Sequence, residues 1–267
     1  MKITNALLTL LLVSPVFNKS DLELYKEKHP DISLDKPLLE RRANPYCDGD
    51  GPIDWRESGC VSPVKNQGSC GSSYAFSAVG ALEFGLCHSG IGVCILSEQQ
   101  VIDCSYNRYS GMNQGCASGR SDVALQYANE QAISCQSNYP YKQTRGSCAV
   151  RSGPPPYKVN YEQIKVANEE ELECLVRKGP VIAYIYVCPR LQMYKSGIFN
   201  DATCYGKVNQ AVLIVGMGQT TDGVEYWIIK NSWGSKWGNE GYFSIVKGQN
   251  MCSIIDNPII TVSVEKR

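Results

Sequence analysis

Thirteen cysteines in 267 residues constrain this chain more than any other feature of its sequence. A protein of a reducing compartment rarely carries so many cysteines without the spacing of metal ligands. This chain has no Cys-x-x-Cys pair and only two histidines, His29 and His88, so a zinc site is disfavoured. We therefore predict a disulfide-bonded fold. Because the number is odd, at least one thiol is free or pairs with another molecule, unless processing removes it.

The first twenty residues have the layout of a secretory signal peptide. Lys2 precedes an apolar run over residues 6–17, and polar residues follow it. The run is too short to cross a bilayer comfortably. A buried helix of the mature fold is the alternative, which we disfavour because the run lies far before the motifs described below. We assign residues 1–20 to a signal peptide and expect a secreted, extracellular or lysosomal-vacuolar protein.

The charges of the chain balance, with 26 basic and 26 acidic residues. Neither sign forms a long run, so nothing indicates a nucleic acid or a charged membrane as partner. With 43% hydrophobic residues the chain can bury an ordinary core. We expect no metal, no cofactor, no nucleic acid and no membrane among its partners.

Apolar spacing predicts helices in the first half of the chain. From Ser73 onward, apolar residues recur at helical spacing and predict one buried face; they are Phe76, Val79, Leu82 and Leu86. Ser97 followed by Gln100 is a capping-box signal for a second helix. A third helix is expected over residues 121–130.

The second half favours strands. Short runs rich in β-branched or aromatic residues, separated by glycine turns, predict strands at residues 181–187, 211–215, 224–230 and 241–246. Asn168 and Glu171 signal a helix before them, and three prolines at 154–156 mark the crossing between the halves. The predicted class is α+β, with a helical lobe over about residues 60–150 and a β lobe over about residues 151–253.

Three segments carry the chemistry of the chain, and they resemble the active-site segments of papain-like cysteine peptidases. Residues 66–77 read Asn-Gln-Gly-Ser-Cys-Gly-Ser-Ser-Tyr-Ala-Phe-Ser, residues 209–218 read Asn-Gln-Ala-Val-Leu-Ile-Val-Gly-Met-Gly, and residues 230–238 read Lys-Asn-Ser-Trp-Gly-Ser-Lys-Trp-Gly. In that family the first segment contains Cys-Gly-Ser-Cys-Trp, and its second Cys is the nucleophile. Further matches follow in family order from about residue 52 to about residue 253.

The resemblance implies a papain-like two-lobed fold over residues 46–267, in which a helical lobe packs against an antiparallel β-barrel-like lobe with a cleft between them. The preceding residues 21–45 would be a prosegment-like region, much shorter than is usual in the family. Either a truncated gene model or an inactive protein that needs no inhibitor explains its length.

Both reactive residues of the family are replaced here. Ser73 stands at the nucleophile position, and Gln210 stands at the position of the catalytic His. The family's thiolate attacks the peptide carbonyl, and its imidazolium protonates the leaving group. A serine hydroxyl does not ionise near neutral pH, and an amide cannot carry a proton between groups. We therefore expect the chain to lack proteolytic activity.

Other site residues of the family are retained. Gln67 matches the residue whose amide helps to form the oxyanion hole, and the N–H of Ser73 would be the second donor. Asn231 matches the residue that orients the His; because that His is absent here, we expect Asn231 to cap local backbone instead. Gly119 and Trp233 are candidate peptide-binding residues, because an extended peptide could pair with main-chain groups of the groove.

Three interpretations follow. The first is an inactive protein that binds peptides, substrates or peptidase inhibitors. The second is an active hydrolase using Ser73 with an unrecognised base; Lys65 has no motif support, and His88 lies roughly 22 Å from Ser73 along the expected helix. The third is a structural secreted protein with a vestigial groove. The pair Ser73 and Gln210 favours the first and third.

The resemblance also implies three disulfides, Cys70–Cys116, Cys104–Cys148 and Cys204–Cys252. The sequence does not fix the pairing of the other seven cysteines, which are Cys47, Cys60, Cys87, Cys94, Cys135, Cys174 and Cys188. Cys87 and Cys94 are near enough in sequence for a local bridge.

Overall fold

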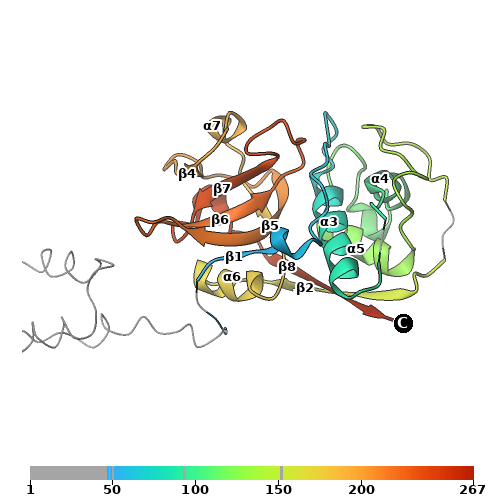
Figure 1. The fold of residues 1–267 in the computed structure, drawn as a ribbon. Coiled ribbons are helices and arrows are strands. Elements are labelled where there is room, and N and C mark those ends of the chain that lie inside the picture. Colours follow the sequence, from blue (N-terminus) through green and yellow to red (C-terminus); the bar gives the residue numbers. More distant parts are fainter. Residues whose placement is uncertain (1–46, 48, 50, 93, 151–152) are drawn as a thin grey trace, which may run out of the picture. The chain divides into compact units, whose positions relative to one another are not determined.

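In the computed structural model, the helices of the first half of the chain and most of the strands lie on different sides of the protein (Figure 1). The three longest helices of the first half stand on one side, and most of the sheet stands on the other. This arrangement confirms the α+β class and the papain-like two-lobed architecture. The structure describes residues 47, 49, 51–92, 94–150 and 153–267; the expected signal peptide and prosegment-like region lie outside these residues.

The central helix α3, Ser73–His88, is buried on every side and not only on the predicted face. All of its residues 74–86 are buried, which is typical of a helix in a protein interior. Strand β8, Ile259–Lys266, approaches it closely at Gly85. A Cβ added there would lie 2.8 Å from Cγ2 of Val264, so a larger residue would push the strand away.

The next two helices of the first half form where the sequence predicts them. In α4, Glu98–Cys104, the Ser97 side chain accepts a hydrogen bond from the N–H of Gln100 at 3.0 Å. The reciprocal half of the capping box is replaced, because the N–H of Ser97 donates to the carbonyl of Ser134. Helix α5 spans Ser121–Glu130, as expected.

Two more helices belong to the β lobe. Helix α6, Glu169–Val176, begins at Asn168, whose side chain accepts from the N–H of Glu171 at 2.9 Å. The short helix α7, Pro189–Gln192, was not predicted. Its four residues are too few to show a helical apolar repeat.

The described strands form one sheet in the order β2-β8-β3-β5-β6-β7-β4, with β1 added on β5. Their bounds are β1 Ile53–Asp54, β2 Tyr157–Ile164, β3 Val181–Ile185, β4 Ile198–Phe199, β5 Gln210–Gln219, β6 Glu225–Lys230, β7 Tyr242–Val246 and β8 Ile259–Lys266. The pairings are antiparallel except that between β4 and β7. The four predicted strands correspond to β3, β5, β6 and β7.

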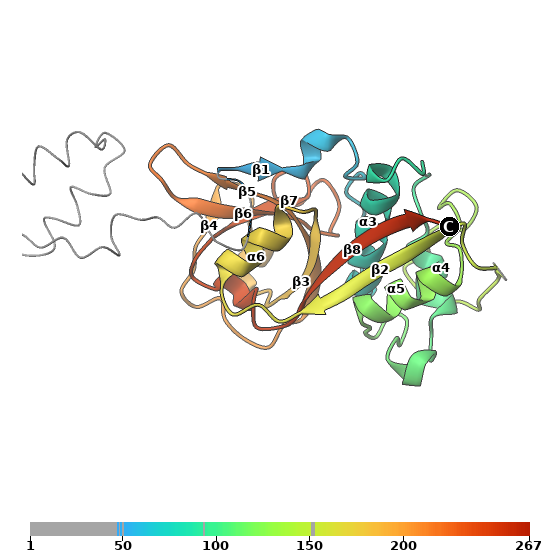
Figure 2. The same cartoon turned by 90° about the horizontal axis from the view of Figure 1, so that it is seen from below.

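Strands β2 and β8 were missed, and β8 lies beyond residue 253, where the β lobe was expected to end. They pair over eight positions, from Tyr157 opposite Lys266 to Ile164 opposite Ile259. Figure 2 shows the pair running from the sheet across to helices α3 and α5. Each strand is only partly buried, so its apolar pattern is weaker than that of the central strands.

Each lobe has its own hydrophobic cluster. The first surrounds α3 and includes residues of α4, α5, β2 and β8. The second lies in the β lobe between the sheet, α6 and α7. The candidate site lies where the start of α3 meets strands β5 and β6.

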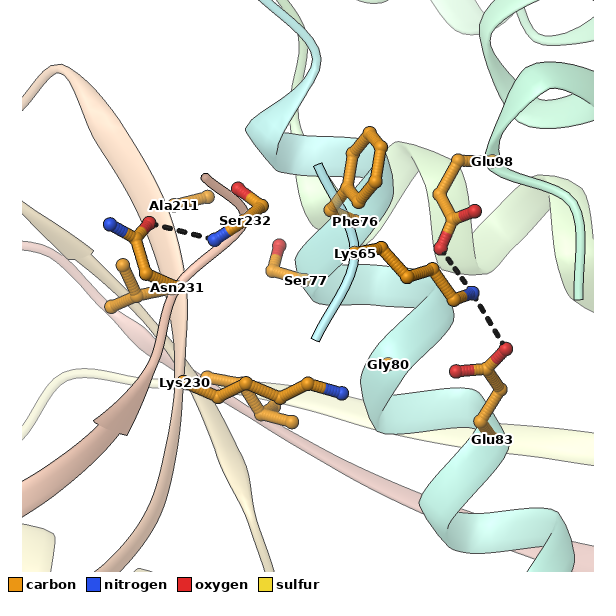
Figure 3. Close-up of a pocket in the computed structure, with 12 residues that line it drawn as sticks. Lys65, Phe76, Ser77, Gly80, Glu83, Glu98, Ala211, Lys230, Asn231 and Ser232 are labelled. Atoms are coloured by element: carbon orange, nitrogen blue, oxygen red, sulfur yellow. Dashed lines mark hydrogen bonds and ion pairs between the residues drawn. The ribbon is translucent and has the colours of Figure 1, made fainter. Parts of the chain in front are cut away.

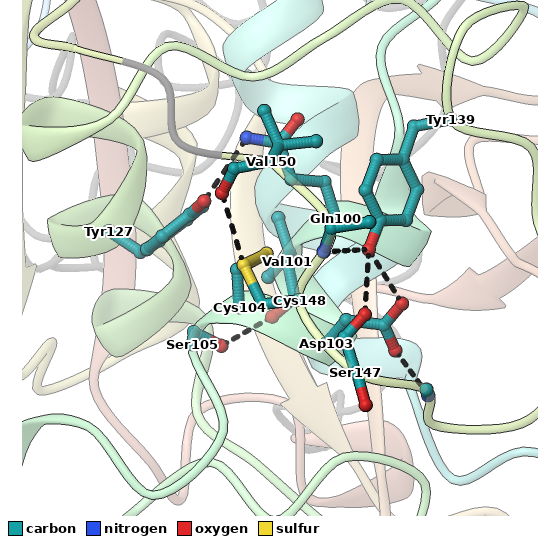
Figure 4. Close-up of a disulfide and its surroundings, with 12 residues drawn as sticks. Gln100, Val101, Asp103, Cys104, Ser105, Tyr127, Tyr139, Ser147, Cys148 and Val150 are labelled. Carbon is teal, nitrogen blue, oxygen red and sulfur yellow. Dashed lines mark hydrogen bonds between the residues drawn. A yellow bond between two sulfur atoms is a disulfide. The ribbon is translucent and has the colours of Figure 1, made fainter.

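Six disulfides connect the described cysteines: Cys47–Cys174, Cys60–Cys87, Cys70–Cys116, Cys94–Cys135, Cys104–Cys148 and Cys188–Cys204. Cys70–Cys116 and Cys104–Cys148 are pairs that the family resemblance implied. Figure 4 shows how Cys104–Cys148 joins α4 to a loop, beside Asp103, whose carboxylate accepts from the hydroxyl of Tyr139 at 2.9 Å.

The structure corrects one expected bridge and decides against one that the sequence left open. Cys204 bonds to Cys188 and not to Cys252, which is free and buried. The reason is that Cys188, the residue before α7, lies with its Cα 5.4 Å from that of Cys204, within disulfide range. A local Cys87–Cys94 bridge does not form either. Cys87 is still inside α3, and both cysteines bond to other partners.

Candidate active site

Ser73 is the first residue of α3 and is half-buried. Its Oγ accepts a hydrogen bond from the N–H of Ala211, at 3.1 Å. The N–H of Ser73 makes no hydrogen bond to any other described residue, as expected in the first turn of a helix. The serine therefore offers one main-chain donor, while its hydroxyl oxygen is held by the neighbouring strand.

Gln210 begins β5 beside Ser73 and acts as a hydrogen-bond donor to a ring of side-chain oxygens. Its Nε2 lies within reach of Gln67 Oε1 at 3.0 Å, Asn231 Oδ1 at 3.1 Å and Ser232 Oγ at 3.3 Å. An amide nitrogen carries two protons, so it serves these three oxygens only in part at any moment. Its side chain is directed by this ring and not by the Ser73 hydroxyl.

Gln67 closes the same ring. Its Oε1 also accepts from the hydroxyl of Ser232 at 2.6 Å, and its Nε2 donates to the carbonyl of Cys70 at 2.9 Å. We call Gln67, Gln210, Asn231 and Ser232 the amide cluster. All four are buried, with 5–7% of their surface exposed. None of these side chains titrates near neutral pH, so the cluster can bind and orient but cannot transfer a proton.

Asn231 and Trp233 are fixed by main-chain contacts. The N–H of Asn231 donates to the carbonyl of Gly241 at 3.1 Å, and its Oδ1 accepts from the N–H of Ser232 at 2.9 Å. Trp233 forms an isolated β-bridge with Asn66 and packs edge-on against Trp237, with 4.7 Å between ring centroids. Asn231 thus caps local backbone as well as binding Gln210.

Gly119 lies against the ring of Tyr74. A Cβ at Gly119 would lie 2.6 Å from that ring, and the Tyr74 hydroxyl donates to the carbonyl of Gly115 at 3.0 Å. Glycine is therefore required here for packing, whether or not a ligand binds. Within the described part of the chain, the main chain of Gly119 takes part in no hydrogen bond. Its N–H and carbonyl remain open to a ligand.

No base lies beside Ser73 among the residues that the structure describes. His88 is at the opposite end of α3, stacked on Phe84 with centroids 5.3 Å apart, and His29 lies outside the described residues. Lys65 donates to Glu83 at 2.8 Å, to Glu98 at 2.6 Å and to a backbone carbonyl. The lysine is fully engaged away from the serine.

A small cavity of about 20 Å³ lies between α3 and strands β5 and β6, next to Asn231 and Ser232 (Figure 3). That volume has room for about one water molecule. Charged side chains surround it, and sequence reasoning missed them. A signal existed for Glu83, the one carboxylate in the mostly apolar α3.

Burial changes the pKa of two groups that line this cavity. It raises the pKa of Glu98 to about 7, although the neighbouring Lys65 works in the opposite direction. It lowers the pKa of Lys230 to about 8. Lys230 donates to the carbonyl and hydroxyl of Ser62, at 2.6 Å and 3.0 Å. Glu98 Oε2 has no hydrogen-bond partner among the described residues.

Over the described residues, no group of three or more His, Cys, Asp or Glu side chains is placed to hold a metal ion. In the same part of the chain, none of the helices has both the length and the apolar character needed to cross a membrane.

Residues 51–262 match the sequence model of the family described as "Papain family cysteine protease". The chain belongs to the papain family. Its match with cathepsin S of Mus musculus is 42% identical over 207 residues, covering 76% of this chain and 60% of the relative. Pro-cathepsin H of Bos taurus is 39% identical over 220 residues, covering 78% of this chain and 64% of the relative. The chain thus spans less than two thirds of the length of these relatives.

Solved structures of the papain family share the fold. The bromelain protease from Ananas comosus, in complex with the E64 inhibitor, superposes with a TM-score of 0.73 at 32% identity, covering 81% of this chain and 100% of bromelain. Digestive procathepsin L 3 from the larval midgut of Tenebrio molitor gives a TM-score of 0.72 at 38% identity, covering 80% and 70% of the two chains.

Proposed function

We propose that this papain-family chain is proteolytically inactive and binds extended peptides or protein segments in the groove beside Ser73. The amide cluster carries the proposal. Gln210, which we place at the position of the family's catalytic His, donates its N–H groups to Gln67, Asn231 and Ser232. A side chain held as a donor in a buried ring is not a proton acceptor.

The environment of Ser73 supports the loss of chemistry. A serine nucleophile needs a general base within hydrogen-bond reach of its hydroxyl. The contact made by the Ser73 Oγ is instead the N–H of Ala211, which can only donate. Lys65, the base that could replace the imidazole in principle, is bound by Glu83 and Glu98.

Binding of an extended peptide requires main-chain donors and acceptors, and it requires neither the Cys nor the His of the family. The open N–H of Ser73 and the open N–H and carbonyl of Gly119 could pair with the backbone of an extended ligand. The ligands we propose are peptides, protein substrates of active relatives, or peptidase inhibitors. Six disulfides fit an oxidising compartment, in keeping with the proposal that the chain is secreted or delivered to a lysosome or vacuole.

Turnover of a broad peptide library by the purified protein tests the loss of activity. We expect no cleavage above that of the Ser73→Ala variant and no covalent adduct with E64, measured by intact mass. Cleavage that disappears in Ser73→Ala would overturn the proposal in favour of a serine hydrolase.

A separate binding experiment distinguishes a ligand groove from a vestigial one. Exposed Ser118 lies next to Gly119, so Ser118→Trp should fill the groove, whereas Lys158→Trp places the same side chain on an exposed position of β2. We expect library peptides to bind the unchanged protein and Lys158→Trp equally, and Ser118→Trp at least tenfold more weakly. Equal binding by all three would show that the peptides bind elsewhere and would overturn this site, whereas no binding by the unchanged protein would favour a structural role.

A further inference from the structure

Three cysteines converge where β3 ends and α7 begins. Cys188 and Cys204 form a disulfide, and the free thiol of Cys252 lies with its sulfur 3.1 Å from the sulfur of Cys204. All three side chains are at most 4% exposed. A thiol in contact with a disulfide sulfur is the starting arrangement for thiol–disulfide exchange.

The backbone holds Cys252 in this place. The carbonyl of Cys252 accepts from the N–H of Tyr186 at 2.7 Å, which ties its segment to the end of β3. Cys252 and Ser253 both have positive φ, at 57° and 61°. Residues other than glycine rarely adopt this conformation, so the contact between the sulfurs depends on a backbone that is unfavourable by itself.

We propose that Cys204 exchanges its disulfide partner between Cys188 and Cys252 in the folded protein, with no external oxidant or reductant. The thiolate of Cys252 attacks the sulfur of Cys204, and the bond between Cys188 and Cys204 breaks as the new one forms. The electron pair of the broken bond stays on the Cys188 sulfur, which takes up the proton that Cys252 lost. One disulfide and one thiol exist before and after.

The exchange changes which segments are joined near the candidate site. In the structure the disulfide fixes the residue before α7; after exchange it would fix the segment of Cys252 instead. The carbonyl of Gln192, the last residue of α7, accepts from the indole N–H of Trp237 at 2.8 Å. Trp237 packs on Trp233, which follows the amide cluster directly. We therefore expect the disulfide partner of Cys204 to affect the positions of Trp237 and Trp233, the aromatic wall of the site.

The surroundings of Cys252 make the exchange slow at neutral pH. Burial, together with the carboxylate of Asp201, raises the pKa of the Cys252 thiol to about 12. Tyr205 is the other titratable group that interacts with this thiol. Only the thiolate attacks. As long as the pH stays below that pKa, each increase of one pH unit should therefore raise the exchange rate about tenfold.

Non-reducing peptide mapping of the full chain tests the proposal. The native protein is incubated at pH 7, 8 and 9 without added thiol, quenched in acid, alkylated and digested with pepsin. We expect Cys204–Cys252 and alkylated Cys188 to appear, about tenfold faster at each step in pH. Cys94–Cys135 should stay unchanged throughout, because the free thiol among the described residues, Cys252, lies against Cys204 and not against this bridge.

Two outcomes would overturn the proposal. One is a single pairing of Cys204 that stays constant at every pH, and the other is scrambling that reaches Cys94–Cys135 equally. The variants Cys188→Ser and Cys252→Ser each leave one pairing, so their tryptophan emission spectra should differ if the site wall responds. Identical spectra would overturn the coupling to Trp233. If either variant fails to fold, mapping of the unchanged protein still decides whether exchange occurs.

Discussion

The side-chain nitrogen of Gln210 lies 3.0 Å from the side-chain oxygen of Gln67. This contact fixes the orientation of both amides, because the nitrogen of Gln67 then faces the carbonyl of Cys70. The Nε2 of Gln67 is the group expected to stabilise an oxyanion, and it already donates a hydrogen bond to this carbonyl inside the protein. A variant designed to hydrolyse peptides must break this contact as well as supply a nucleophile and a base.

Introducing the family's reactive Cys and His should give the protein peptidase activity. We expect Ser73→Cys combined with Gln210→His to hydrolyse peptides measurably, and neither single change to do so. A Cys without imidazole keeps an ordinary pKa and has no acid for the leaving group. Groups that act as one unit are strongly non-additive, so the double variant should far exceed the sum of the singles. Fluorogenic peptide assays measure this; a folded but inert double variant would show that the groove itself has changed.

Removing the Gln210 amide should destabilise the fold. In Gln210→Leu the oxygens of Gln67 and Asn231 each lose one donor but keep another from Ser232, so we expect the loss of a net buried hydrogen bond, about 0.5–1.5 kcal/mol of unfolding free energy. Gln219→Leu makes the same change at the exposed end of β5 and should have little effect. Denaturant unfolding of both variants measures the difference, and equal stabilities would contradict a structural role for the cluster.

The Tyr74 hydroxyl should contribute to stability in the same way. Tyr74→Phe leaves the carbonyl of Gly115 without its buried donor, and we expect a loss of about 1–3 kcal/mol. Tyr226→Phe is the control, since its hydroxyl makes no hydrogen bond to a described residue. Thermal unfolding should separate the two variants; a Tyr74→Phe protein as stable as the control would refute the assignment.

The buried carboxyl of Glu98 should give stability a pH dependence. Its folded-state pKa, about 7, lies above its ordinary value of 4.5, so the folded protein binds this proton more tightly than the unfolded chain does. Its contribution to the unfolding free energy therefore falls as pH rises from about 4.5 to about 7. Glu98→Gln should flatten the stability profile in this window, whereas exposed Glu162→Gln should not. Urea titrations at pH 5, 6 and 7 provide the comparison.

The sequence predicted the elements whose patterns are strong. The β-branched runs of β3, β5 and β6 are continuous because those strands are buried centrally, and the caps at Ser97 and Asn168 mark helix starts through local hydrogen bonds. Strands β2 and β8 were missed because they are only partly buried, which weakens the apolar signal.

The site was predictable in its residues but not in its contacts. Motif spacing located Ser73, Gln210 and Asn231, but which amide atom faces which neighbour depends on side chains from three separate segments. The pairing of Cys204 failed for a similar reason. Cys188 and Cys252 both approach it in space, and sequence separation does not say which sulfur is closer to bonding geometry.

Strand β8 has a consequence for how the chain is made. It supplies Ile260 and Val264 to the cluster around α3 and lies against Gly85, although it follows the whole β lobe in sequence. During synthesis the helical lobe emerges from the ribosome long before this strand does. The apolar surface of the helical lobe that β8 covers must therefore stay exposed until the β lobe has been translated. The two lobes then become stable together and not one after the other.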